Sequence, residues 1–124
     1  MRTLLPTLLC LLVCTPGYAT SGDSQLRTFA NCAGRLTAQL EHAWLMHDDS
    51  AETIEDQRAQ VVELLSAIMP QEAGRDVLNW RIDARAAQRA LLQRATFTQD
   101  PSEAEWAGNL AQQYVADCTG FLLS

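Results

Sequence analysis

Residues 26–44 read LRTFANCAGRLTAQLEHAW, and the rest of the chain can be arranged around the pattern they carry. Apolar residues recur there at steps of three and four, the spacing that gathers side chains on one face of an α-helix. The face holds Leu26, Phe29, Cys32, Ala33, Leu36, Leu40, Ala43 and Trp44. We therefore predict a helix over residues 24–47 that turns Cys32 towards a core.

A second cysteine stands in a similar setting near the other end of the chain. Residues 100–103 read Asp-Pro-Ser-Glu, which combines an N-cap, a first-turn proline and a capping glutamate. Apolar residues follow at helical spacing, namely Trp106, Leu110, Tyr114, Cys118, Phe121 and Leu122. A helix that begins at Pro101 would thus direct Cys118 inward.

Two more helices are expected between these two, and no segment alternates for long enough to indicate a strand. The earlier one covers residues 51–69, ends at Pro70, and has capping-box spacing between Asp49 and Glu52. Its apolar residues are Ile54, Val61, Val62, Leu65, Ile68 and Met69. The later one covers residues 72–96, with Ala73, Val77, Trp80, Ala84, Ala87, Leu91 and Ala95 on its inward face.

The predicted fold is all-α: a small antiparallel four-helix domain closed by one disulfide between the first and last helices. Short connections favour antiparallel neighbours, which would bring Cys32 and Cys118 to the same level. A looser orthogonal packing of the four helices would also allow the bond. On the chain-entropy model, such a long closed loop stabilises the domain by about 4–5 kcal/mol. Trp44, Trp80, Trp106 and Tyr114 are expected in the core.

The first nineteen residues have the three parts of a secretory signal peptide, ending in Pro16-Gly17-Tyr18-Ala19. Cleavage after Ala19 would remove Cys10 and Cys14 and leave residues 20–124 as a single helical domain. One alternative is an uncleaved N-terminal anchor. Another is a lipoprotein with a lipidated Cys14, but that processing expects a small residue just before the cysteine, and Val13 fits poorly. An exported protein with two remaining cysteines usually pairs them. We expect a periplasmic or secreted bacterial protein.

The charge balance is acidic, with nine arginines, no lysine and fifteen carboxylates. Removal of Arg2 with the leader would leave eight arginines and a net charge of −7. This charge disfavours nucleic acid and anionic membranes as general partners. The remaining chain has no apolar run that would insert stably into a membrane.

No catalytic motif is recognisable, and we expect neither an enzyme nor a cofactor. The two cysteines are best used in a disulfide, and no serine lies in a nucleophile-elbow pattern. His42 and His47 are five residues apart, a step that turns two helical side chains about 140° apart, so no metal site is expected. The alternative function is a small-ligand or metal carrier that uses the bundle interior or the end with His42 and His47.

Arginines recur at steps of four in the third predicted helix, at Arg81, Arg85 and Arg89, beside Leu78 and Ile82. The simpler interpretation pairs them with acidic residues of the second helix, namely Glu52, Glu55, Asp56 and Glu63. The other interpretation is a surface for a protein partner, since arginine grips carboxylate or phosphate through its planar fork of donors. The expected function is therefore that of a non-enzymatic binding protein of the bacterial envelope.

Overall fold

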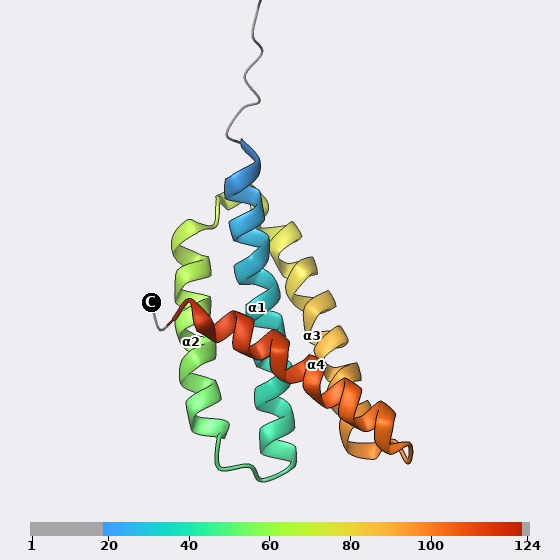
Figure 1. Ribbon diagram of the computed structural model, residues 1–124. Coiled ribbons are helices and arrows are strands. Elements are labelled where there is room, and N and C mark those ends of the chain that lie inside the picture. The colour runs from blue at the N-terminus through green and yellow to red at the C-terminus, as the bar shows by residue number, and fades with distance from the viewer. Residues whose placement is uncertain (1–18, 123–124) are drawn as a thin grey trace, which may run out of the picture.

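The computed structural model describes residues 19–122, and in this range the protein is helical without a strand (Figure 1). The elements are α1 (Ala19–Leu45), α2 (Ala51–Ile68), the short 3₁₀ helix η1 (Gln71–Ala73), α3 (Gly74–Phe97) and α4 (Pro101–Gly120). The all-α prediction is confirmed. The predicted signal peptide lies almost entirely outside the described residues.

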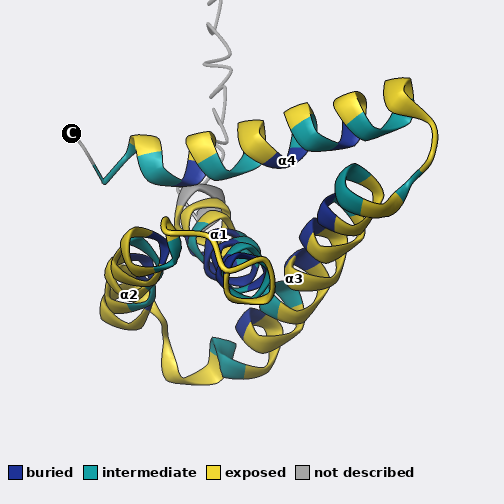
Figure 2. Ribbon diagram, turned by 90° about the horizontal axis from the view of Figure 1, so that it is seen from below, coloured by how far each residue is buried: buried dark blue, intermediate teal, exposed yellow. Residues whose placement is uncertain are grey.

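Helix α1 is the centre of the molecule. Helices α2 and α3 flank it on opposite sides, and α4 crosses one face of this layer obliquely (Figures 1 and 2). Figure 2 also shows that the link between α2 and α3 passes on the side away from α4. Because α1 separates α2 from α3, the expected hairpin of those two helices is not formed. The opposite face of the layer has no fourth helix over it.

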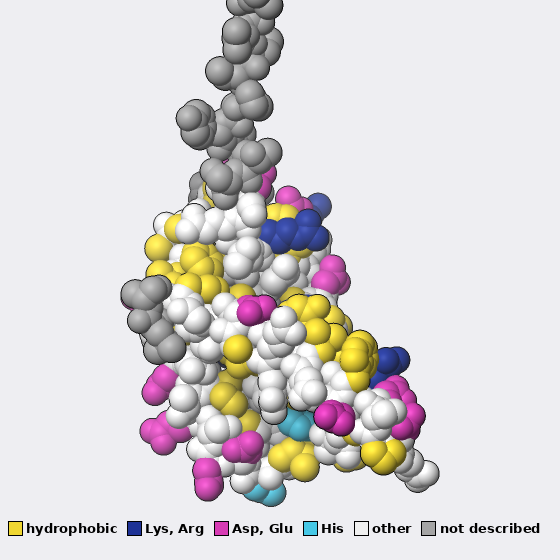
Figure 3. Space-filling model, viewed as in Figure 1, with side chains coloured by type: hydrophobic (Ala, Val, Ile, Leu, Met, Phe, Trp, Pro, Cys, Tyr) yellow, Lys and Arg dark blue, Asp and Glu magenta, His cyan; other side chains and the backbone are white. Residues whose placement is uncertain are grey.

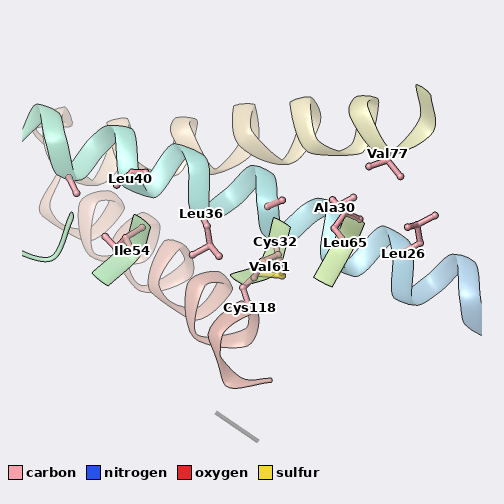
Figure 4. Packing of buried hydrophobic residues seen from close by; sticks show 12 residues of the cluster. Leu26, Ala30, Cys32, Leu36, Leu40, Ile54, Val61, Leu65, Val77 and Cys118 are labelled. Atoms are coloured by element: carbon pink, nitrogen blue, oxygen red, sulfur yellow. A yellow bond between two sulfur atoms is a disulfide. The ribbon is translucent and has the colours of Figure 1, made fainter. Parts of the chain in front are cut away.

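The core is built on the predicted stripe of α1. Leu36 and Ala33 of that stripe are fully buried, and Leu26, Cys32 and Leu40 nearly so. Figure 4 shows these residues packed with Ile54, Val61 and Leu65 of α2 and with Val77 of α3. The predicted disulfide is confirmed, since Cys32 and Cys118 are bonded with their Cα atoms 5.4 Å apart. Phe29 and Phe121 pack edge to face beside it, with ring centroids 5.1 Å apart.

Not every predicted core residue is buried. Trp44 and Trp106 remain 54% and 52% exposed, so their expected core role is wrong. Their neighbours Ala43 and Ala107 occupy the helix contacts instead. Small residues at a contact allow two helices to approach closely, and the adjoining indoles then lie outside. Ala87, Ile68 and Met69 are likewise exposed, while Trp80 and Tyr114 are half-buried.

The two predicted N-caps had different outcomes. Asp100 caps α4 as expected: its Oδ1 accepts hydrogen bonds from the Ser102 backbone N–H at 3.0 Å and from the Ser102 hydroxyl at 2.9 Å. The capping box of Asp49 and Glu52 is not formed, because Ser50 occupies the N-cap position of α2. Asp48 closes this turn instead, accepting a 2.8 Å bond from the Ser50 N–H.

Helices α1 and α3 approach each other closely at Gly34. A Cβ atom placed there would lie 2.2 Å from the Arg81 carbonyl oxygen and 3.0 Å from the Arg85 backbone nitrogen. Neither backbone atom belongs to a flexible side chain that could move away. Gly34 therefore sets the separation of the two helices.

We predict that Gly34→Ala lowers the free energy of unfolding by about 1–3 kcal/mol, since α3 must shift to admit the methyl group. Gly108→Ala in α4 is the matched control, because its Cβ would meet only the Ala95 Cβ at an ordinary 3.7 Å. Alanine in a helix interior should stabilise the protein by about 0.5–1 kcal/mol. Urea unfolding of both variants measures the difference, and equal effects would contradict the close contact.

The Asp100 cap predicts a specific acid sensitivity. Hydrogen bonds from the Ser102 side chain and backbone lower the pKa of the Asp100 carboxyl below its ordinary value. Its stabilisation is therefore complete above the unfolded pKa of about 3.9 and is lost as the pH falls through the lower folded pKa. We expect Asp100→Asn, which can still cap but does not titrate, to reduce the fall of the melting temperature in this range. Parallel falls in both proteins would show that the cap does not contribute.

Candidate functional site

The uncovered face of the helix layer contains a groove of about 210 Å³. Its floor is α1, one wall is α2, and the other wall is α3. The lining residues are Gly34, Thr37, Arg58, Leu78, Arg81, Ile82 and Arg85. We call this set the arginine groove. It collects positive charge and exposed apolar surface on one side of an acidic molecule.

Four of the five predicted binding residues line the groove. Arg81 and Arg85 line the groove from the α3 wall, and Leu78 and Ile82 belong to the same wall with 54% of their surface exposed. Arg89 follows one turn later and lines a smaller cavity of about 100 Å³, which it shares with Glu41 and His42. The five residues thus form one continuous strip along α3.

Arg85 reaches towards α1 and not towards the acidic residues of α2. Arg85 forms a two-pronged ion pair with Glu41 of α1, in which its Nε donates to Oε2 at 3.1 Å. From the opposite wall, the Nε of Arg58 donates to the Thr37 hydroxyl at 2.9 Å. The ion pairs seen within residues 22–122 join α1 to α3 and α3 to α4, so the expected pairing of α2 with α3 is wrong. The intervening α1 keeps the two helices apart.

A buried glutamine three residues after Arg85 fixes the rotation of α3. Gln88 is fully buried, and its amide nitrogen donates to the Ala111 carbonyl of α4 at 3.1 Å and to the Gln39 side chain of α1 at 3.2 Å. Its oxygen accepts a 3.0 Å bond from Arg35. A buried amide with these partners permits little rotation of α3, because unmade buried hydrogen bonds are costly. The arginine strip is therefore held towards the groove.

Arg35 completes this network on the side of α4. Its guanidinium lies 3.6 Å from the centroid of the Tyr114 ring, a favourable cation–π distance. Partial burial lowers the pKa of Arg35 from its ordinary value, with an opposing contribution from Tyr114. Arginine nevertheless stays charged at neutral pH. The network thus adds a specific polar tie between α1, α3 and α4.

The two histidines lie in different surroundings. His42 is half-buried, with Nε2 at 3.3 Å from the Thr96 hydroxyl. His47 is exposed in the turn after α1, where it has a positive φ of 55°. Within the part of the chain that the structure describes, no three His, Cys, Asp or Glu side chains are grouped to hold a metal ion.

Three residues that shape the groove were not predicted from the sequence: Gly34, Arg58 and Gln88. Two of them left a signal. Arg58 is four residues after Ile54 and three before Val61, and Gln88 is four after Ala84, so each polar residue interrupts an apolar stripe. Gly34 left none, because a glycine within a helical stripe does not show which backbone approaches it.

The chain was compared with protein-family models, with curated proteins and with solved structures, and none matched. In the described range, none of the helices has the length and hydropathy needed to cross a membrane.

The exposed apolar residues of the groove should contribute little to folding. We predict that Leu78→Gln and Ile82→Gln each change the free energy of unfolding by no more than about 0.5 kcal/mol, as for other exposed sites. Val77→Ala is the matched control, because the adjoining Val77 is only 3% exposed and should cost at least about 1 kcal/mol. Chemical unfolding measures all three. A large loss from Leu78→Gln would show that the residue supports the fold.

Proposed function

We propose that this protein is a non-enzymatic binding protein that holds a macromolecular partner in the arginine groove. The observation that carries the proposal is the juxtaposition of Leu78 and Ile82, each 54% exposed, with Arg58, Arg81 and Arg85 around one hollow. Apolar side chains beside arginine are typical of the surfaces at which proteins bind each other.

The distribution of charge supports the same proposal. The chain carries a net charge of −6, and Figure 3 shows acidic side chains spread over the face that α4 crosses. Dark blue arginine side chains appear there only near the upper and right edges. The groove lies on the opposite face, so it is a positive feature on a negative protein. Such local complementarity steers a partner to one face.

The proposed setting is the envelope or exterior of a bacterium. The Cys32–Cys118 bond favours an oxidising compartment, and the pattern of the first nineteen residues favours export. A carrier of metal or small ligands is the less favoured function, because the cavity beside His42 has a volume of only about 100 Å³.

Site-specific crosslinking in the host cell tests the proposal. A photoreactive amino acid at Ile82 should yield a discrete adduct with one partner, since this side chain lies at the groove. The same amino acid at Gln112, an exposed position of α4, is the control and should yield no such adduct. The adduct is detected by immunoblotting and identified by mass spectrometry.

The triple variant Arg81→Ala, Arg85→Ala, Arg89→Ala should remove the Ile82 adduct, because it removes the charges proposed to hold the partner. Circular dichroism melting confirms that the variant remains folded. Equal adducts from Ile82 and Gln112, or an adduct that survives in the folded triple variant, would refute the proposed function.

A further inference from the structure

We infer that the partner segment held by the arginine groove is an acidic amphipathic helix, with carboxylates one helical turn apart beside a row of apolar side chains. This inference rests on the proposed function and specifies the chemistry of its partner. It follows from the unequal charge of the groove, from the spacing of its residues, and from the ion pair that Arg85 makes with Glu41.

Positive charge in the groove exceeds what the chain itself neutralises. Three arginines line the groove, namely Arg58, Arg81 and Arg85, and only Arg85 is paired with a carboxylate. Arg58 donates to a neutral hydroxyl. Among the described residues, no carboxylate lies within ion-pair distance of Arg81. The groove therefore offers donor forks that suit incoming carboxylates.

The spacing of the α3 wall matches a helical partner. Arg81 and Arg85 are one turn apart, which separates them by about 6 Å along the helix axis. Leu78 and Ile82 are also one helical turn apart, and each has 54% of its surface exposed. A helix with an acidic stripe beside an apolar stripe repeats both features at this period, so it can lie in the groove with both rows in contact.

Other anionic partners fit these features less well. A nucleic acid offers phosphates but leaves Leu78 and Ile82 without apolar contact, and the net charge of −6 opposes it. A flat anionic membrane would meet the exposed apolar rim but would not reach Arg58 and Arg81 together in a hollow between two helices.

Glu41 has a distinct role in this arrangement. Its carboxylate accepts hydrogen bonds from the guanidinium of Arg85, and Arg85 lines the groove, so a partner carboxylate must share Arg85 with it. The Glu41 carboxylate therefore competes with the partner's carboxylate for Arg85 and weakens binding. Removing its charge while keeping its shape should strengthen binding of an acidic helix, whereas a purely structural ion pair would not have this effect.

The test uses the folded, disulfide-bonded protein and a synthetic peptide of about 16 residues, which spans about 24 Å as a helix. Glutamates and leucines repeat at one-turn spacing on adjoining faces of the peptide, and a control peptide carries glutamine for every glutamate. Fluorescence anisotropy should show that the glutamate peptide binds at least about tenfold more tightly, since hydrogen bonds between charged groups are the stronger ones. This preference should shrink at about 0.5 M salt.

Variants assign the effect to the groove. Arg81→Ala should weaken binding of the glutamate peptide by about tenfold, and Glu41→Gln should strengthen it about threefold or more. Arg75→Ala, an exposed arginine of α3 that does not line the groove, is the matched control and should change binding by less than about twofold.

Equal affinity for the two peptides, the absence of saturable binding, or weaker binding by Glu41→Gln would overturn the inference. So would tighter, Arg81-dependent binding to vesicles of anionic lipid than to the peptide. These outcomes are distinguishable from failure of the proposed function, because a groove-dependent adduct at Ile82 would then still form in cells with a partner of another chemistry.

Discussion

The backbone of α3 lies directly against Gly34 of α1, and much of the architecture depends on that contact. The missing side chain lets the carbonyl of Arg81 and the amide of Arg85 approach α1 more closely than any other residue type would allow. These two residues also line the groove. The close contact at Gly34 and the candidate site therefore share the same turn of α3. For the proposed function, a groove wall held by backbone contact would lower the entropic cost of ordering the site on binding.

The general fold was predictable because its signals are local or covalent. Helical spacing in residues 26–44 and the cap at Asp100 each depend on neighbours in the chain, and both were confirmed. The Cys32–Cys118 bond was predictable because the two residues lie at inward positions of the first and last helices. The order of the helices in space was less accessible. Helices α2 and α3 could have packed against each other, but α1 lies between them. This arrangement depends on contacts between helices, such as that of Gly34, which the periodicity of the sequence does not encode.

Only the α3 side of the candidate site was predicted from the sequence. The strip of Arg81, Arg85, Arg89, Leu78 and Ile82 was visible as a polar face with leucine and isoleucine beside it. Its opposite wall was not, because Arg58 belongs to another helix that only the tertiary structure brings near. Trp44 and Trp106 were predicted to be buried because they are large and apolar, but they are exposed. The adjoining alanines make the helix contacts instead. Close packing of two helices favours the smaller of two adjacent residues at the contact. Which residue is buried therefore depends on the neighbouring helix and not on the sequence of one helix alone.

At the groove, residue types and their surroundings do not match. Leu78 and Ile82 would be expected on a covered face, and Arg81 would be expected beside one of fifteen available carboxylates. Neither expectation is met on the described surface, although α2 carries several acidic residues. More than half of the surface of Leu78 and of Ile82 is exposed, so burial within the fold does not account for these two residues. Local inconsistency of this kind concentrates at functional sites, where a partner supplies the missing contacts. At this groove, the proposed partner would supply a carboxylate to Arg81 and an apolar cover to Leu78 and Ile82.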